Sequence, residues 1–491
     1  MDATMAFRQG LALLDEDYAE ELLPAAQQVA ARFPGDARIH QLAGLVARTC
    51  GESGIALAEF AEAARLAPRD ALIAHSHARA ALEAGKPAAR LFDIAARLAP
   101  QDGSVLVGRA AARVQEGDSA RAMEELTAIV RQNPLWTDGH SSLAQLRGQL
   151  GTDPVAEMRT AITRNPRSPE LNYLLANTLL SGRNFTAAEA ALADAERQLP
   201  GQPWIALLKA HAVSEQGRIS AADALFAALP PANGIDAVSL RARHLVRANR
   251  AGEAAQLLEP WIARDQDHLL WPYLSLAWRM EGDPRWEWLE GDRNLVGTYD
   301  IQDQVAAIPG LAEHLRSLHF ASDEPLDQSV RGGTQTDGNL LLRDEEPIRA
   351  LRALLLETVA RHVAALPEPR EGHPTLPAQR APRRISGSWS VRLRDAGFHS
   401  DHVHSKGWFS SALYVALPED MRGEQARAAH HGWLSLGECR DVVPELAPVY
   451  LVEPKVGRLA LFPSTMWHGT RPFPAGERMT VAFDIAIPKQ S

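Results

Sequence analysis

Evenly spaced prolines are the feature that most constrains the fold of this chain. They stand 32 or 34 residues apart, at Pro34, Pro68, Pro100, Pro134, Pro166 and Pro200. A period near 34 residues is typical of arrays in which each unit is a pair of helices. Because proline cannot continue the interior of a helix, each of these prolines is expected between one unit and the next. The sequence therefore predicts an α-solenoid over residues 1–290.

Glycines follow the same period, at Gly51, Gly85, Gly117, Gly151, Gly182, Gly217, Gly252 and Gly282. We expect each in the turn between the two helices of a unit, where a left-handed backbone costs glycine little. The intervening segments are rich in Ala and Leu with helical periodicity. This array resembles the tetratricopeptide repeat family over residues 1–290. The resemblance implies a concave groove that docks a protein or peptide, with a rigid arm or a dimerisation surface as the alternative.

Composition narrows the classes of partner. The net charge is −10 and no basic block stands out, which argues against nucleic acid as a partner. The only cysteines, Cys50 and Cys439, lie far apart, as is usual in a reducing compartment. The first residues do not read as a signal peptide, and no run of 18 apolar residues is present. We therefore expect a cytoplasmic protein that does not enter a membrane.

The repeat pattern ends near residue 285. Residues 291–384 are interpreted as a connecting segment of helix and loop, with one long helix from Asp344 to about Pro367. Short strands separated by turn residues are predicted from residue 385 to 491, at 388–394, 408–417, 449–452, 458–462 and 479–487. Such strands favour a β-sandwich or jelly roll. The predicted fold class is α+β, with an α-solenoid followed by a strand domain.

A dense cluster of metal-ligand side chains precedes the second of these strands. Residues two apart on a strand face the same side, so that His399 with Asp401, or His402 with His404, could serve one metal ion. His468 follows the fourth predicted strand, and Arg478 comes ten residues later. Histidine ligands together with an arginine for an anion indicate a site for iron and a 2-oxo acid.

Zinc is the alternative metal, because His402, His404 and His468 with one water would form a common zinc site. Arg478 favours an anionic co-substrate over this alternative. The sequence also lacks an obvious nucleophile motif of a hydrolase, such as Gly-x-Ser-x-Gly.

Several motifs resemble, in order, the 2-oxoglutarate/Fe(II) oxygenases that are found fused to tetratricopeptide repeats. They lie at 328–340, at 397–415 and at 462–478, so the resemblance covers roughly residues 320–488. It implies a double-stranded β-helix (jelly-roll) core at 385–491 that uses Fe(II), 2-oxoglutarate and O₂. It also implies roles for individual residues.

By that resemblance His402 is the proximal metal ligand and His468 the distal one. Arg478 would hold the distal carboxylate of 2-oxoglutarate, and Thr480 could add a hydroxyl donor. His404 stands where better-known relatives carry Asp, which leaves the third ligand open between His404, Asp401 and water. We favour His404, with Asp401 second.

The surroundings of these residues give further expectations. Arg471, in the turn after His468, is the rival to Arg478 for the anion. Trp389, Trp408 and Tyr414 are candidate pocket walls, and His399 is expected to be a surface or turn residue.

The sequence thus predicts an Fe(II)/2-oxoglutarate-dependent oxygenase that hydroxylates a protein or peptide presented by the repeats. One alternative is a non-catalytic binding scaffold with a degenerate oxygenase-like domain. Another is a small-molecule oxygenase whose repeats mediate assembly.

Overall fold

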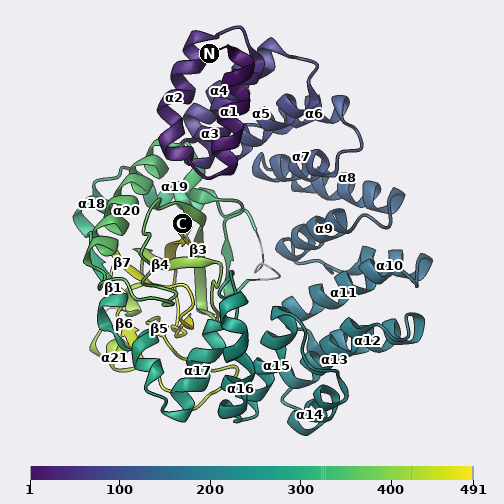
Figure 1. The fold of residues 1–491 in the computed structure, drawn as a ribbon, viewed down its shortest axis with the longest axis vertical. Helices are drawn as coiled ribbons and strands as arrows, with labels where there is room; N and C mark the ends of the chain where they lie inside the picture. The colour runs from purple at the N-terminus through teal and green to yellow at the C-terminus, as the bar shows by residue number, and fades with distance from the viewer. Residues whose placement is uncertain (1, 322, 324–325, 327, 422, 489–491) are drawn as a thin grey trace. The chain divides into compact units, whose positions relative to one another are not determined.

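The computed structural model describes residues 2–488 except 322, 324, 325, 327 and 422 (Figure 1). It divides into two compact units. The N-terminal unit comprises residues 1–132 and 337–354, and the C-terminal unit comprises residues 133–336 and 355–491. Among the described residues, no helix is both long enough and apolar enough to cross a bilayer.

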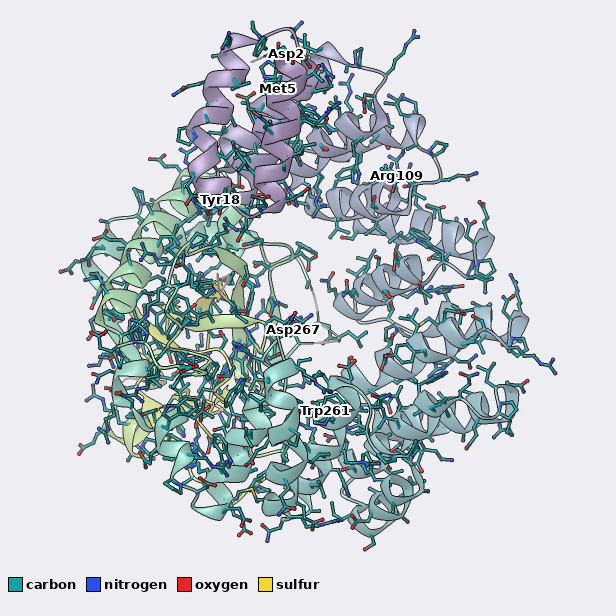
Figure 2. All side chains as sticks on the ribbon, viewed as in Figure 1. Asp2, Met5, Tyr18, Arg109, Trp261 and Asp267 are labelled. Atoms are coloured by element: carbon teal, nitrogen blue, oxygen red, sulfur yellow. The ribbon has the colours of Figure 1, made fainter. Side chains whose placement is uncertain are left out.

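Antiparallel helix pairs fill most of the N-terminal unit, as the proline period predicts. Its helices are α1 (Ala3–Asp15), α2 (Ala19–Arg32), α3 (Ala37–Thr49), α4 (Ser53–Leu66), α5 (Ala71–Glu83), α6 (Ala89–Leu98), α7 (Gly103–Gln115) and α8 (Ser119–Gln132). Apolar residues on facing helices build the core between pairs. Met5 and Tyr18, labelled in Figure 2, remain exposed at the first pair.

The C-terminal unit continues the array in the same manner. Its repeat helices are α9 (Thr137–Gln149), α10 (Ala156–Arg164), α11 (Pro169–Ser181), α12 (Phe185–Gln198), α13 (Pro203–Glu215), α14 (Ile219–Ala228), α15 (Ile235–Arg247), α16 (Ala251–Leu258) and α17 (Trp271–Glu281). All six periodic prolines lie in loops, two residues after the end of a helix. The repeat prediction is confirmed over this part of the chain.

The glycine prediction is right at most positions and wrong at two. Gly51, Gly85, Gly117, Gly151 and Gly217 adopt a positive φ in the turn within a helix pair, and Gly282 does so at the end of α17. The other two turns place the left-handed backbone on Arg183 and Asn249 instead, so Gly182 is not the left-handed residue and Gly252 lies inside α16. Asn tolerates this conformation better than most residues, which explains why glycine is dispensable at 249.

A recurring hydrogen bond closes the loop that precedes several pairs. The side chains of His40, His140 and Asn172 each contact the carbonyl oxygen of the proline six residues earlier, at 3.2, 3.0 and 3.1 Å. This contact gives the proline carbonyl a hydrogen-bond donor from the next helix, so it stabilises the proline turn. Polar residues thus occupy buried positions of the repeat for a structural reason.

Two antiparallel sheets form the core that follows the repeats. The larger sheet has the order β1-β7-β4-β9-β3-β2 and the smaller one β6-β5-β8. The strands are β1 (Gly297–Asp300), β2 (Val330–Gln335), β3 (Ile385–His399), β4 (Gly407–Ala416), β5 (Leu434–Leu436), β6 (Tyr450–Val452), β7 (Arg458–Pro463), β8 (His468–Thr470) and β9 (Arg478–Ala486). β9 lies between β3 and β4, in the middle of the larger sheet.

Residues 291–384 contribute more than a connection. They hold the expected long helix, α20 (Glu346–Ala365), but also two strands of the larger sheet. β1 pairs with β7, and β2 pairs with β3, so the sheet begins well before residue 385. The segment also holds the short helices α18 (Gln302–Ala306) and α19 (Leu311–Ser317). Both strands lie at sheet edges, and their short sequences lack the alternation that would have revealed them.

The last repeats and the strand domain share one hydrophobic core. Residues of α15, α16 and α17 pack with Cys439, Val442 and Trp467, which follow β5 and precede β8. The indole Nε1 of Trp467 donates a hydrogen bond to the carbonyl oxygen of Pro272 at 3.0 Å. A boundary at residue 290 therefore does not separate two independent cores.

Glu290 is a buried carboxyl group beside this shared core. It lies on a π-helical turn (Glu287–Gly291) and accepts a hydrogen bond from the Ser275 hydroxyl at 2.6 Å. Burial raises the pKa of Glu290 to about 7. The folded protein therefore keeps a proton that the unfolded chain releases above its ordinary pKa of 4.5, so this group lowers stability as the pH rises from 4.5 to about 7.

We predict that Glu290→Gln removes this pH dependence. At pH 8 the variant should be more stable than the wild type by at most about 3 kcal/mol, seen as a Tm increase of roughly 5 °C. At pH 5 the two proteins should melt together. Thermal melting at both pH values tests this, with Glu287→Gln on the same turn as an exposed control. A Tm difference that is equal at both pH values would contradict the prediction.

Candidate metal and co-substrate site

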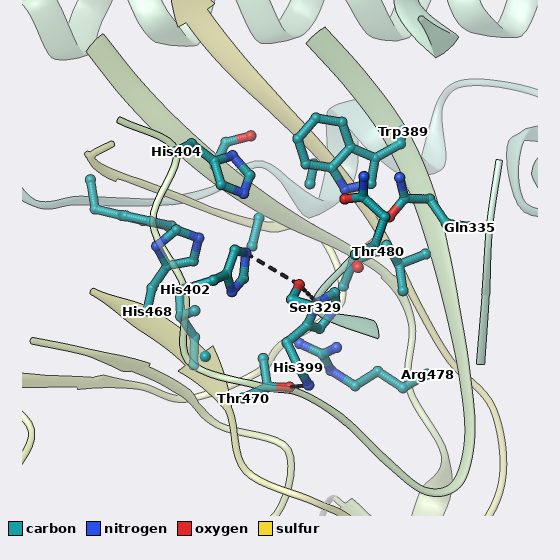
Figure 3. A pocket seen from close by; sticks show the side chains of 18 residues that line it. Ser329, Gln335, Trp389, His399, His402, His404, His468, Thr470, Arg478 and Thr480 are labelled. Carbon is teal, nitrogen blue, oxygen red and sulfur yellow. Dashed lines mark hydrogen bonds between the residues drawn. The ribbon is translucent and has the colours of Figure 1, made fainter. Parts of the chain in front are cut away.

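Three histidines converge on one point in the strand domain. His402, His404 and His468 each place a ring nitrogen within 4.8 Å of the other two (Figure 3). His468 begins β8, and its backbone pairs with that of His402 through two hydrogen bonds of 2.9 Å. This bridge fixes the two rings against each other, with centroids 4.2 Å apart. No other group of three or more metal-ligand side chains is found among the described residues.

Each of the three rings has its Nδ1 atom held by an oxygen. The partners are the carbonyl oxygen of Ser400 for His402 (2.8 Å), that of Met466 for His468 (3.0 Å) and the carboxylate of Asp484 for His404 (2.7 Å). Carbonyl oxygens only accept, so Nδ1 of His402 and of His468 carries the proton. Their Nε2 atoms are left with lone pairs, as metal-ligating histidines require.

Burial keeps two of these rings neutral. It lowers the pKa of His402 to about 3 and that of His468 well below its ordinary value, and the neighbouring histidines act in the same direction. A metal ion would therefore displace no proton from them at neutral pH. The Nε2 atom of His402 also lies 3.3 Å from the Ser329 hydroxyl.

Asp401, the second choice for the third ligand, is turned to another partner. Both of its oxygens accept hydrogen bonds from the Arg440 guanidinium, one of them at 2.8 Å, and the backbone NH of Arg440 donates at 2.7 Å. Its side chain is 1% exposed. The chain bends after β3, so that His402 and His404 face the pocket while Asp401 does not.

Arg478 is a buried cation that forms no ion pair with any residue the structure describes. It is 1% exposed, and its guanidinium lies over the Tyr414 ring at 5.1 Å. Neither Nε nor Nη1 has a hydrogen-bond partner among the described residues. Burial lowers the pKa of Arg478, although arginine remains charged at neutral pH. An unpaired buried charge costs several kcal/mol, so this geometry fits an anionic ligand.

The rival arginine is already paired. Arg471 donates to the Glu438 carboxylate at 3.1 Å, and Glu438 is 3% exposed. Of these two arginines, Arg478 lines the pocket and Arg471 does not.

The strand β9 carries one functional side chain at every second position. Arg478, Thr480 and Ala482 line the pocket, and Asp484 follows on the same face, behind His404. The sequence prediction stopped at Thr480. Continuing the alternation by two more steps would have identified Asp484.

The pocket is lined by residues of both sheets and holds a cavity of about 50 Å³. Figure 3 shows the three imidazoles on one side and Arg478 on another, with Trp389 and Gln335 on a third. Gln335, on β2, was missed because β2 itself was not predicted. Three imidazole donors and a guanidinium with unbonded N–H groups suit a divalent metal with an anionic chelator.

Of the three aromatic residues predicted to line the pocket, Trp389, Trp408 and Tyr414, each has a different position relative to it. Trp389 lines the pocket, with its ring 5.3 Å from that of His404. Tyr414 is fully buried beneath Arg478 and supports it. Trp408 does not line the pocket, because its indole NH is bonded to the carbonyl oxygen of Thr375 at 2.9 Å in the core.

The expectation that His399 is a surface or turn residue is wrong. It ends β3 and lines the pocket beside Arg478, and its Nδ1 atom lies 2.9 Å from the Ser329 hydroxyl. The alternation rule placed it with Asp401, but that rule fails because the chain is not extended after residue 399.

Comparison with known proteins agrees with this site. Residues 387–484 match the family model described as "Putative 2OG-Fe(II) oxygenase". The C-terminal region therefore carries an oxygenase-family domain, and the resemblance seen in the sequence is confirmed there. No curated protein matches the chain.

Solved structures show distant likenesses to both parts. One is an oxidoreductase of the 2OG-Fe(II) oxygenase family from Burkholderia pseudomallei, with 15% identity, 40% of this chain and 85% of that chain covered, and a TM-score of 0.27. Another is a tetratricopeptide repeat protein from Parabacteroides merdae, with 14% identity, 49% and 98% covered, and a TM-score of 0.31.

We predict that the third ligand can be identified by metal stoichiometry. His404→Ala and His468→Ala should each lower anaerobic Fe(II) binding from about one ion per chain to well under half, because each removes one of three donors. Asp401→Asn should keep the full ion while melting at a lower temperature, because Arg440 loses a charged partner. Loss of the ion in Asp401→Asn with retention in His404→Ala would reverse the assignment.

Proposed function

We propose that this protein is an Fe(II)- and 2-oxoglutarate-dependent oxygenase. The observation that carries the proposal is Arg478, a buried guanidinium that has no counter-ion among the described residues and lies in the pocket that the three histidines line. His402, His404 and His468 would hold the Fe(II). When bound, the ion supplies the activation of O₂ that couples decarboxylation of the keto acid to oxidation of a substrate C–H bond.

The overall reaction balances with the co-substrate. Substrate, O₂ and 2-oxoglutarate give hydroxylated substrate, succinate and CO₂. One oxygen atom enters the substrate and the other enters succinate, so no external reductant is needed for each turnover. Succinate is therefore a direct measure of activity.

The chain's own residues would orient the co-substrate. A guanidinium offers two parallel N–H donors to one carboxylate, and the Tyr414 ring limits its movement. Thr480, also buried in the pocket wall, can donate its hydroxyl to the same carboxylate. Because Arg478 and Thr480 are both buried, these contacts are stronger than they would be at the surface.

The zinc alternative explains the three histidines equally well. It leaves Arg478 without a role, however, and a buried guanidinium without an anion is costly. The degenerate-scaffold alternative has the same difficulty, because a domain without a ligand gains nothing from this arginine.

A protein or peptide is the substrate class that we favour. The family resemblance of the repeats supports a docking role, and α15–α17 share a hydrophobic core with the segment that leads to His468. A macromolecule that binds the last repeats would therefore contact the same compact unit that carries the pocket.

Our prediction for Arg478 compares two lysine variants. Arg478→Lys should raise the KM for 2-oxoglutarate roughly 100-fold with a smaller change in kcat, because lysine loses the two-point contact with the carboxylate. Arg471→Lys keeps the charge opposite Glu438 and is the matched control, with the KM expected to stay near the wild-type value. Succinate formation against 2-oxoglutarate concentration gives both constants. Equal effects of the two variants would contradict the assignment, and no turnover of iron-loaded wild type would refute the enzyme.

The substrate class can be tested by fractionating a cell extract by size. We expect the protein fraction to stimulate succinate formation by the full-length protein, and a protein in that fraction to gain the mass of one oxygen atom. The histidine variant His468→Ala serves as the inactive control. Stimulation by the small-molecule fraction alone would favour the reading in which the repeats mediate assembly.

A further inference from the structure

We infer that Asp484 supplies the negative charge of this metal site indirectly. Its carboxylate contacts the imidazole of His404, a proposed metal ligand, and does not contact the metal itself. In this assignment Asp484 is a positioning residue that orients His404 and strengthens its Nε2 donor. The inference rests on the proposed metal-binding role of the three histidines. It does not depend on 2-oxoglutarate or on turnover.

The contact between Asp484 and His404 differs in kind from the other two. His402 and His468 donate to neutral backbone carbonyls, whereas His404 contacts a carboxylate, Oδ2 of Asp484, at 2.7 Å from Nδ1. Hydrogen bonds to a charged acceptor are about twice as strong as neutral ones. His404 is therefore the ligand whose orientation is most firmly set and whose donor strength is most increased.

Asp484 is itself held by the centre of the larger sheet. Its Cα position is paired with that of Ser410 on β4, and the Ser410 hydroxyl donates to Oδ1 at 2.6 Å. The Ser410 oxygen also lies 2.9 Å from the Ser464 hydroxyl, which follows β7. Both carboxylate oxygens are thus engaged, one by a ligand and one by the sheet, so the carboxylate cannot turn toward the metal without losing these contacts.

Charge balance gives this arrangement a chemical purpose. A site with two histidines and one carboxylate supplies one negative charge to the metal, while three neutral imidazoles supply none. Asp484 supplies that negative charge through His404, because a carboxylate that shares the proton on Nδ1 gives the imidazole ring partial imidazolate character. The sequence shows His404 in place of an acid, and the structure supplies an acid directly behind it.

Asp401 provides a natural control for this inference. It also lies beside the histidines and carries the same charge, but it is bonded to Arg440 and not to a histidine ring. A general electrostatic effect of a nearby carboxylate would be seen at both positions. An effect that acts through His404 would be seen only at Asp484.

The experiment is a titration of the full-length, metal-free protein with Co(II), followed by its visible absorption bands and by calorimetry. Asp484→Asn should weaken Co(II) binding by about 10- to 100-fold and shift the bands, because the amide keeps an acceptor for Nδ1 but removes the charge. Asp401→Asn should bind Co(II) within about threefold of the wild type and keep its spectrum. Circular dichroism confirms that each variant is folded.

Two outcomes would overturn the inference. One is Co(II) affinity and bands of Asp484→Asn that match the wild type, and the other is an equal loss in Asp401→Asn. If Asp484→Asn does not fold, Ser410→Ala takes its place, since it loosens the carboxylate and should weaken Co(II) binding severalfold. Failure of the wild type to bind Co(II) at all would instead refute the metal site of the proposed function.

Discussion

The burial of Trp467 against the last repeats determines the position of His468, one of the three proposed metal ligands. This indole is 4% exposed, and it packs edge-on against Tyr273 of α17 with centroids 5.7 Å apart. Its hydrogen bond to the carbonyl oxygen of Pro272 fixes the orientation of the indole ring as well as its position in the core. His468 is the next residue along the chain, so the repeat helices position a proposed ligand through one covalent step. A helical array that only tethered a separate enzyme would not need this contact.

The same core organises the ionic contacts beside the pocket. Cys439 and Val442 lie in it, and the segment between β5 and β6 that carries them also carries Glu438 and Arg440. Arg440 holds Asp401, and Glu438 contacts both Arg440 and Arg471. Each acid therefore has a basic partner, and each of these two arginines has an acid. Arg478 lies outside this network, which explains why it remains available for an anion while Arg471 does not.

Local patterns in the sequence were enough to predict the elements whose structure is decided locally. Proline loops and helix pairs depend on residues a few positions apart, and β9 has enough alternation to be recognised alone. β5 and β8 have three residues each, and their strand structure depends on pairing, since β5 pairs with β8 on one side and with β6 on the other. No property of Leu434–Leu436 by itself distinguishes a strand from a turn. The turns near Gly182 and Gly252 show the same limit, since the left-handed residue lies one position away at Arg183 and three positions away at Asn249.

The residues of the candidate site also fall into two groups: those predicted from local sequence and those whose roles depend on distant partners. The family motif placed His402, His468 and Arg478, because their spacing is a property of the sequence. The role of Asp401 depends on Arg440, 39 residues later, and that of His404 on Asp484, 80 residues later. Neither partner is near in sequence, and each is brought close by strand pairing or by the shared core. Sequence reasoning could therefore name the candidates for the third ligand but could not choose between them on physical grounds.

Charge counting argues for a keto-acid site over a plain zinc site. A divalent ion and the Arg478 guanidinium carry three positive charges, while a dicarboxylate co-substrate and Asp484 carry three negative ones. A pocket between two sheets has a low effective dielectric constant, so a balanced set of charges is strongly preferred over an unbalanced one. A zinc ion with hydroxide and Asp484 would leave one positive charge, equal to that of Arg478, without compensation. The unpaired buried arginine and the carboxylate behind His404 are thus explained together by one anionic ligand of double charge.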